Sequence, residues 1–98
     1  MLFMCQGKAK PGLSTDDQQK VLGLFASWKP PAGIEVKQHY ISATGGDFVV
    51  VETDSVAALI EATALWAPFV VYEVTPIVAV ADGVGSIQRA EATRRNLI

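Results

Sequence analysis

Two short apolar runs constrain the fold of this chain most strongly. Leu2–Cys5 and Phe48–Val51 are uninterrupted hydrophobic stretches. A strand with one face in water alternates apolar and polar residues, whereas a strand covered on both faces is apolar at every position. We therefore expect both runs to be central strands of one sheet, and both faces of that sheet need a cover.

The length and composition set the class of protein. Ninety-eight residues predict a single domain, 1–98. Half of the residues are hydrophobic and only 18% are charged, which favours association with another chain. The net charge of −2 disfavours nucleic acid and anionic membranes as partners. No segment approaches the ~20 apolar residues that span a bilayer. The single cysteine, Cys5, forms no intrachain disulfide, so we expect a reducing compartment, the cytoplasm.

Turn residues and apolar periodicity predict four strands and three helices. The strands are expected at 1–9, 34–43, 48–53 and 69–80. The first helix begins at a capping box of Thr15 and Gln18 and ends before Pro30, and the second is capped by Asp54 or Ser55 and ends at Pro68. A short last helix is expected to follow a glycine-containing turn, in which Asp82 is a cap, and to begin at Ser86.

This order, β-α-β-β-α-β plus a C-terminal helix, indicates an α+β, ferredoxin-like (split-βαβ) domain. Right-handed crossovers put the first two helices on one face of the sheet and the first and third strands in its centre, where the apolar runs lie. The other face is then uncovered. Two such sheets packed face to face form a homodimer, a dimeric α/β barrel. The alternative is that the last helix folds under the sheet of its own chain.

The sequence resembles a family of small bacterial proteins of the dimeric α/β-barrel type whose function is unknown. The resemblance rests on four motifs in roughly residues 1–80. They are Met1-Leu2-Phe3-Met4, Pro31-Ala32-Gly33-Ile34, Glu52-Thr53-Asp54, and Trp66 ahead of Tyr72-Glu73-Val74-Thr75-Pro76-Ile77. It implies a dimeric barrel but no reaction. Similar barrels include cofactor-independent monooxygenases, polyketide cyclases, haem-degrading enzymes, isomerases and stress-responsive proteins, and fold analogy does not choose among them.

His39, the only histidine, is the first candidate catalytic residue. If Ile34 and Val36 face the helices, strand alternation points His39 to the opposite, cavity-facing side of the sheet, where a neutral imidazole can act as a general base. The simpler interpretation is a solvated edge-strand histidine or one that bridges a dimer contact. No ligand spacing supports a metal site of His39 with Glu52 or Glu73.

Glu73 is the second candidate catalytic residue, because it stands inside an otherwise apolar strand. A carboxyl group in an apolar cavity has a raised pKa and can exchange protons near neutral pH. The alternative is a salt bridge with Lys8, Lys37 or an arginine of the last helix. Glu52 is assigned to the ligand-binding set, with a structural partner or a helix-start acceptor as its other role.

The aromatic residues predict a flat ligand. Tyr40, Trp66 and Tyr72 are candidate ligand-binding residues, whereas Trp28 fits the apolar stripe of the first helix and is expected to be core packing. Cys5 is expected to be an inert buried thiol.

Two functions follow from these features. In the first, the barrel cavity binds or transforms an apolar, aromatic small molecule without a metal or other cofactor, in a monooxygenase-, cyclase- or isomerase-like reaction. In the second, the chain is a non-catalytic dimeric interaction or stress-responsive module with a filled interior. A haem-handling role is a third option, with His39 as its only histidine ligand.

Overall fold

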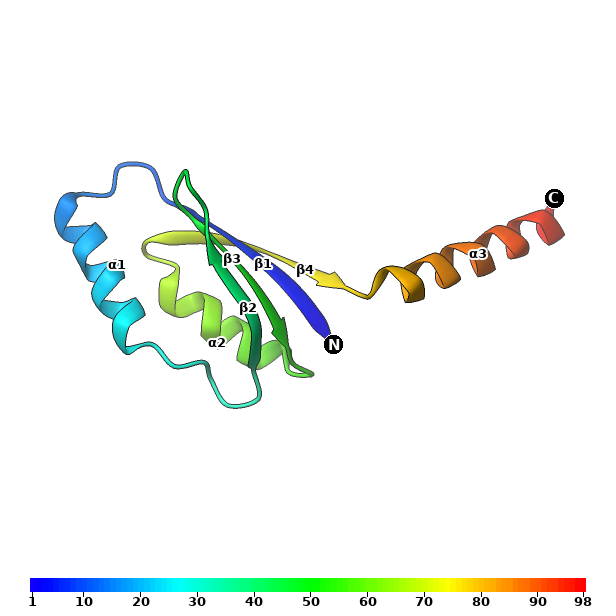
Figure 1. The fold of residues 1–98 in the computed structure, drawn as a ribbon, viewed down its shortest axis with the longest axis horizontal. Helices are drawn as coiled ribbons and strands as arrows, with labels where there is room; N and C mark the ends of the chain where they lie inside the picture. The colour runs from blue at the N-terminus through cyan, green and yellow to red at the C-terminus, as the bar shows by residue number, and fades with distance from the viewer.

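A computed structural model describes all 98 residues as an α+β protein with one four-stranded antiparallel sheet and three helices (Figure 1). In chain order the elements are β1 (Leu2–Ala9), α1 (Thr15–Ser27), β2 (Glu35–Ile41), β3 (Asp47–Glu52), α2 (Val56–Trp66), β4 (Val70–Ile77) and α3 (Val80–Leu97). The strands lie in the order β2-β3-β1-β4. The two apolar runs therefore occupy the central strands β1 and β3, as the sequence predicts.

Side-chain caps fix where α1 and α2 begin. The Ser14 hydroxyl accepts a hydrogen bond of 3.0 Å from the backbone N–H of Asp17, and the Asp17 carboxylate accepts one of 3.2 Å from Ser14. The capping box thus lies one residue before the predicted Thr15. Ser55 caps α2 through a 3.1 Å bond from the Ala58 N–H. These caps satisfy N–H groups that have no partner within their helices.

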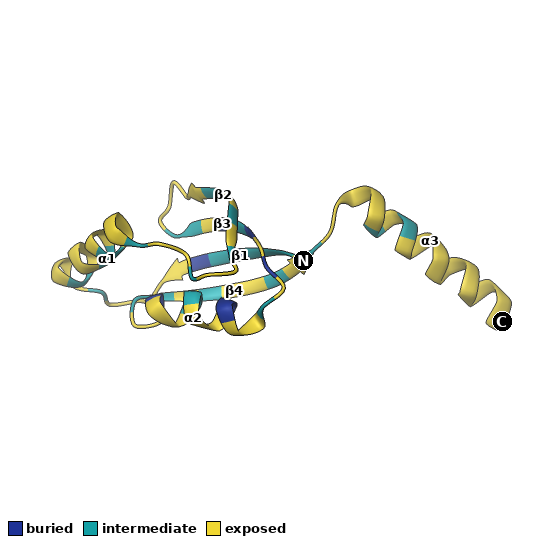
Figure 2. Cartoon of the chain, turned by 90° about the horizontal axis from the view of Figure 1, so that it is seen from below, coloured by how far each residue is buried: buried dark blue, intermediate teal, exposed yellow.

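The core is small and lies between the sheet and α2. Cys5, Val49, Val51 and Leu59 form its buried cluster. By contrast, α1 lies on the same side of the sheet but contains no buried residue, and Figures 1 and 2 show it standing apart from the strands. The candidate site is a pocket between α1, α2 and the sheet.

The C-terminal helix differs from the prediction. It begins at Val80 rather than Ser86, and it includes Gly83 and Gly85, because a glycine costs only about 1 kcal/mol in a helix interior. Asp82 lies in its first turn and is not a cap; Ala79 occupies that position and makes no side-chain cap bond. No helix of the chain combines the length and apolar character that crossing a membrane requires.

Rather than covering its own sheet, α3 extends away from it, exposed along its length (Figures 1 and 2). The chain therefore measures 60 × 29 × 20 Å with a radius of gyration of 17.5 Å, against about 13 Å for a compact chain of this size. The alternative in which α3 covers the sheet of its own chain is therefore wrong. The sheet face opposite α1 and α2 is called the open face. Strand register places on it Leu2, Met4, Gln6, Lys8, Phe48, Val50, Val71 and Glu73.

A bulge interrupts β2. Val36 pairs with Val51, but the next pair along the strands joins Gln38 to Val50, so Lys37 is an extra residue on β2. An extra residue reverses the inward–outward alternation beyond it. Val36 and His39 therefore share the helix-facing side of the sheet, although three positions separate them.

Candidate functional site

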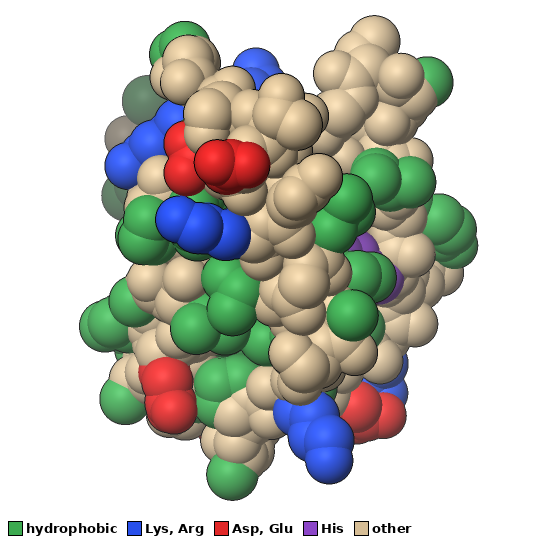
Figure 3. All heavy atoms as spheres, turned by 90° about the vertical axis from the view of Figure 1, so that its left-hand side faces the viewer, with side chains coloured by type: hydrophobic (Ala, Val, Ile, Leu, Met, Phe, Trp, Pro, Cys, Tyr) green, Lys and Arg blue, Asp and Glu red, His purple; other side chains and the backbone are tan.

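A pocket of about 480 Å³ lies between the sheet and the helices α1 and α2. Such a volume falls within the usual range of small-molecule sites. Sixteen of its 20 lining residues are hydrophobic, and the polar groups of His39 and Tyr72 meet at Asp47. Figure 3 shows the imidazole of His39 between hydrophobic side chains on the α1 side of the molecule.

The polar end of the pocket is a hydrogen-bonded cluster of His39, Asp47 and Tyr72. The Nε2 atom of His39 lies 2.8 Å from Oδ2 of Asp47, and the Tyr72 hydroxyl donates a 2.9 Å hydrogen bond to the same oxygen. An ionised carboxylate only accepts hydrogen bonds, so the imidazole donates through Nε2. In the neutral ring the Nδ1 atom then carries the lone pair, and Asp47 fixes that tautomer.

Gly7 makes this cluster sterically feasible. In the sheet register Gly7 pairs with Asp47 on one side and with Tyr72 on the other, so the three residues form one row across β3, β1 and β4. Two strand spacings, about 10 Å, separate the outer members of the row. Because Gly7 has no side chain, the Asp47 carboxylate and the Tyr72 phenol extend over it and form their hydrogen bond. A Cβ atom at Gly7 would clash with Oδ1 of Asp47 and with the Tyr72 ring.

The predicted side for His39 is wrong, because the sequence argument assumed unbroken alternation along β2. The bulge at Lys37 turns the imidazole toward the helices. There its ring lies edge-on to Phe25 and Trp28, with centroid distances of 5.6 and 6.4 Å. The pocket that contains it is accordingly on the helix side of the sheet within one chain, and not on the open face.

Trp28 and Trp66 form the aromatic wall of the pocket. Trp28 is the C-cap residue of α1, Trp66 is the last residue of α2, and their rings meet edge-to-face at 6.0 Å. Trp66, a predicted ligand-binding residue, is 6% exposed and lines this pocket on the helix side of the sheet. Trp28, expected to be core packing, is half-buried and lines the pocket as well. Such edge-on pairs leave ring faces available to a flat ligand.

The cluster resists further negative charge. Burial, followed by the nearby Asp47 carboxylate and its hydrogen bond, raises the pKa of the Tyr72 hydroxyl well above its ordinary value. Burial and the same carboxylate raise the pKa of the Cys5 thiol, which also lines the pocket. Tyr72 therefore stays a neutral donor and Cys5 a neutral thiol near pH 7.

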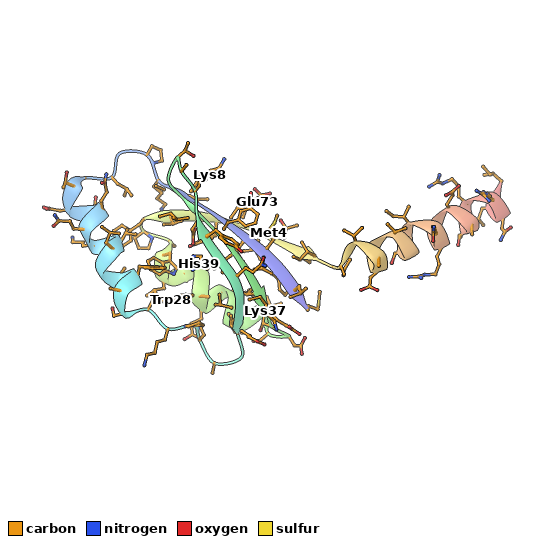
Figure 4. All side chains as sticks on the ribbon, in the orientation of Figure 1. Met4, Lys8, Trp28, Lys37, His39 and Glu73 are labelled. Carbon is orange, nitrogen blue, oxygen red and sulfur yellow. The ribbon has the colours of Figure 1, made fainter.

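The other predicted site residues lie away from this cluster. Glu73 pairs with Gln6 on the open face, so the sheet separates it from His39, as Figure 4 shows. Glu52 is on the open face as well. It forms an ion pair of 3.3 Å with Lys37, whose ammonium group also lies 3.1 Å from the carboxylate of Glu35. These two carboxylates raise the pKa of Lys37, chiefly through the hydrogen bond to Glu35. Tyr40 borders the pocket, but its pairing with Phe48 directs its side chain to the open face.

Asp47 is the site residue that sequence reasoning missed, because it lies in the connection between the strands predicted at 34–43 and 48–53. Two signals point to it in retrospect. Asp47 shares strand parity with the buried Val49 and Val51, and a carboxylate on a buried face needs hydrogen-bond partners. Gly7 interrupts the strand that pairs with it, and a glycine inside a strand often marks a close approach.

No group of three or more histidine, cysteine, aspartate or glutamate side chains is arranged to hold a metal ion. No curated protein and no solved structure gives a significant match to the chain. Residues 1–91 match the family described as "Domain of unknown function (DUF3303)". That match covers the sheet, α1, α2 and most of α3, and the chain therefore belongs to this family of unknown function.

Proposed function

We propose that this protein binds a flat, largely apolar small molecule in the pocket and that His39 exchanges a proton with it. The observation that carries the proposal is the 2.8 Å contact between His39 and Asp47 at the end of an apolar, aromatic-lined pocket. In the usual arrangement for a histidine general base, a carboxylate accepts a hydrogen bond from one ring nitrogen and the other ring nitrogen takes the proton. Asp47 holds the ring and stabilises the imidazolium that forms when Nδ1 takes a proton.

The Nδ1 atom is accessible for this step. No hydrogen bond within the chain involves it, and no side-chain nitrogen or oxygen is both fully buried and without a partner. His39 lines the pocket, so the proposal places a ligand there against this nitrogen. Tyr72 takes no proton in the proposed step; its hydroxyl holds the carboxylate in place.

Three reaction classes that occur among similar barrels use such a base. An isomerase-like reaction needs nothing else, because the proton leaves one ligand atom for Nδ1 and returns to another. A cyclase-like reaction uses the same base to generate a carbon nucleophile within the ligand. A monooxygenase-like reaction also needs dioxygen as a co-reactant. We favour the isomerase-like step because the residues of the cluster supply all of its parts.

The size of the pocket favours this function over a non-catalytic module. An interaction module with an interior filled by side chains would have no room for a ligand, whereas this pocket is about 480 Å³. A haem-handling role has less support, because the Nε2 atom of the only histidine is already hydrogen-bonded to Asp47. We also propose a cytoplasmic location, since the one cysteine is a free thiol.

We further propose that two copies pack through their open faces, as in a dimeric α/β barrel. Apolar side chains, including Met4 and Val50, occupy the middle of that face, and α3 does not cover them. Lys8 and Glu73 lie on the same face, and neither has an ion-pair partner within its own chain. A two-fold axis requires a self-complementary surface, which a mixed pair of charges around an apolar centre provides. In this arrangement Glu73 serves the dimer contact.

Native mass spectrometry of freshly purified protein tests both proposals, because one spectrum reports subunit number and any co-purified small molecule. We expect a dimer with a bound ligand of low mass. His39→Phe keeps the ring packing and removes the nitrogens, so this variant should lose turnover of the identified ligand while its melting temperature stays close to that of the wild type. Asp54→Asn, an exposed site paired with the N-terminus, is the control. Equal turnover in the His39→Phe variant would refute the role of His39.

A further inference from the structure

We infer that the pocket selects a ligand that donates a hydrogen bond, namely a flat aromatic or similarly apolar molecule with a hydroxyl group, over a carboxylate or an ether of the same size. This inference rests on the proposed function and names its ligand class. It follows from the hydrogen bonds within the chain, which already occupy the donors at the polar end of the pocket and leave acceptors for a ligand.

The donors of the cluster are occupied. His39 Nε2–H and the Tyr72 hydroxyl both point at Oδ2 of Asp47, at 2.8 and 2.9 Å. Thr63, another polar residue of the lining, donates its hydroxyl hydrogen to the carbonyl of Leu59 at 3.0 Å within its own helix. With neutral His39, the groups left for a ligand at the cluster are lone pairs, above all that of Nδ1. A ligand hydroxyl satisfies that lone pair, whereas a second acceptor leaves it without a partner.

The negative charge of Asp47 at the polar end also disfavours a ligand carboxylate. Asp47 is the only carboxylate among the lining residues, and no lysine or arginine lies among them. A ligand carboxylate would therefore stand near Asp47 with no cation to offset the repulsion. Burial is the main cause of the raised pKa values of Tyr72 and Cys5, and the Asp47 carboxylate raises both pKa values further.

The indole N–H groups of Trp28 and Trp66 do not change this preference. Both residues belong to the apolar wall of the pocket, and a single neutral donor cannot compensate an ionised carboxylate taken from water. Their rings, together with Phe25, instead supply edges and faces against which a fused aromatic ring packs.

Three probes of nearly equal size test the inference by calorimetric titration near neutral pH: 2-naphthol, 2-methoxynaphthalene and 2-naphthoate. They share the aromatic ring system and differ in the polar group, which is a donor, an acceptor without charge, or an anion. We expect 2-naphthol to bind about tenfold more tightly than 2-methoxynaphthalene, and 2-naphthoate to bind most weakly. In the His39→Phe variant the preference for 2-naphthol over 2-methoxynaphthalene should disappear while both still bind.

The outcomes separate this inference from the proposed function. If 2-methoxynaphthalene binds as tightly as 2-naphthol, or if 2-naphthoate binds best, the inference is overturned and the pocket stands as an apolar ligand site. If none of the three probes binds, the proposed function itself fails. Asp54→Asn is again the matched control, because it changes a carboxylate that is 95% exposed and is not among the residues that line the pocket. Its order of affinities should equal that of the wild type.

Discussion

Tyr72 donates a 2.9 Å hydrogen bond to Asp47 across a strand that contributes no side chain between them. The two residues belong to β4 and β3, and Gly7 of β1 lies in the row that joins them. The contact thus depends on three strands that are far apart in sequence. It holds the carboxylate that orients His39, so the geometry of the proposed general base depends on the absence of a side chain at Gly7.

Substitution of Gly7 tests this dependence. In Gly7→Ala the new methyl group meets Oδ1 of Asp47 and the Tyr72 ring, so one of them must move. We expect the free energy of unfolding, measured by urea denaturation, to fall by about 1–3 kcal/mol, as for other overpacked sites. Binding of 2-naphthol should weaken as well. Gly23→Ala is the matched control: nothing lies within 4 Å of its added Cβ, and in the interior of α1 it should stabilise by about 0.5–1 kcal/mol. Unchanged stability in Gly7→Ala would contradict the packing described here.

The raised pKa of Tyr72 predicts how stability depends on alkaline pH. In a Tyr40→Phe background Tyr72 is the only tyrosine, so the ultraviolet absorbance of tyrosinate reports it alone. In the unfolded chain this hydroxyl loses its proton near the ordinary value of 10.0, whereas the folded protein retains it to higher pH. The folded state then binds more protons than the unfolded state, so stability falls as the pH rises above about 10. A tyrosinate transition of the native protein at the ordinary value would contradict the burial of Tyr72 and its contact with Asp47.

The open face predicts the effect of a charge on assembly. Phe48 is 37% exposed and lies on that face, so Phe48→Glu puts two carboxylates into a symmetric interface without burying a charge in the isolated chain. We expect this variant to sediment as a monomer in analytical ultracentrifugation while the wild type sediments as a dimer. Ile60→Glu, an equally drastic change at an exposed position of α2, should leave the dimer intact. A monomeric wild type, or a dimeric Phe48→Glu variant, would contradict the proposed interface.

Cys5 provides a probe of the pocket that needs no substitution. The thiol is 4% exposed and lines the pocket, and burial raises its pKa, so little of the reactive thiolate is present near neutral pH. We expect a disulfide reagent to modify native protein at least about tenfold more slowly than protein unfolded in urea. Saturating 2-naphthol should slow the native reaction further by occupying the space next to the sulfur. A reaction equally fast in both states would mean that the sheet and helices do not enclose this residue.

The strand order, and the placement of α1 and α2 on one face of the sheet, could be predicted from the sequence. Both follow from local hydrophobic patterns and from the rule that crossover connections are right-handed. Unbroken apolar runs indicated which strands are central, and right-handed crossovers placed the helices. Trp66 and Tyr72 were among the predicted ligand-binding residues and line the pocket, but the pocket lies on the opposite side of the sheet from the predicted cavity. The C-terminal helix could be predicted too, but not its start at Val80, because Gly83 and Gly85 indicated a turn before Ser86.

The sequence by itself determined the topology of this protein and the central position of β1 and β3. Only the tertiary structure decided on which side of the sheet the chemistry lies. A single extra residue at Lys37 reverses the facing of His39, and the strand pairing brings Asp47 and Tyr72 together over Gly7. The physical reason is that local patterns specify which residues avoid water. The register of the strands, and the room that a glycine in one strand leaves for side chains of its neighbours, arise only when distant segments pair.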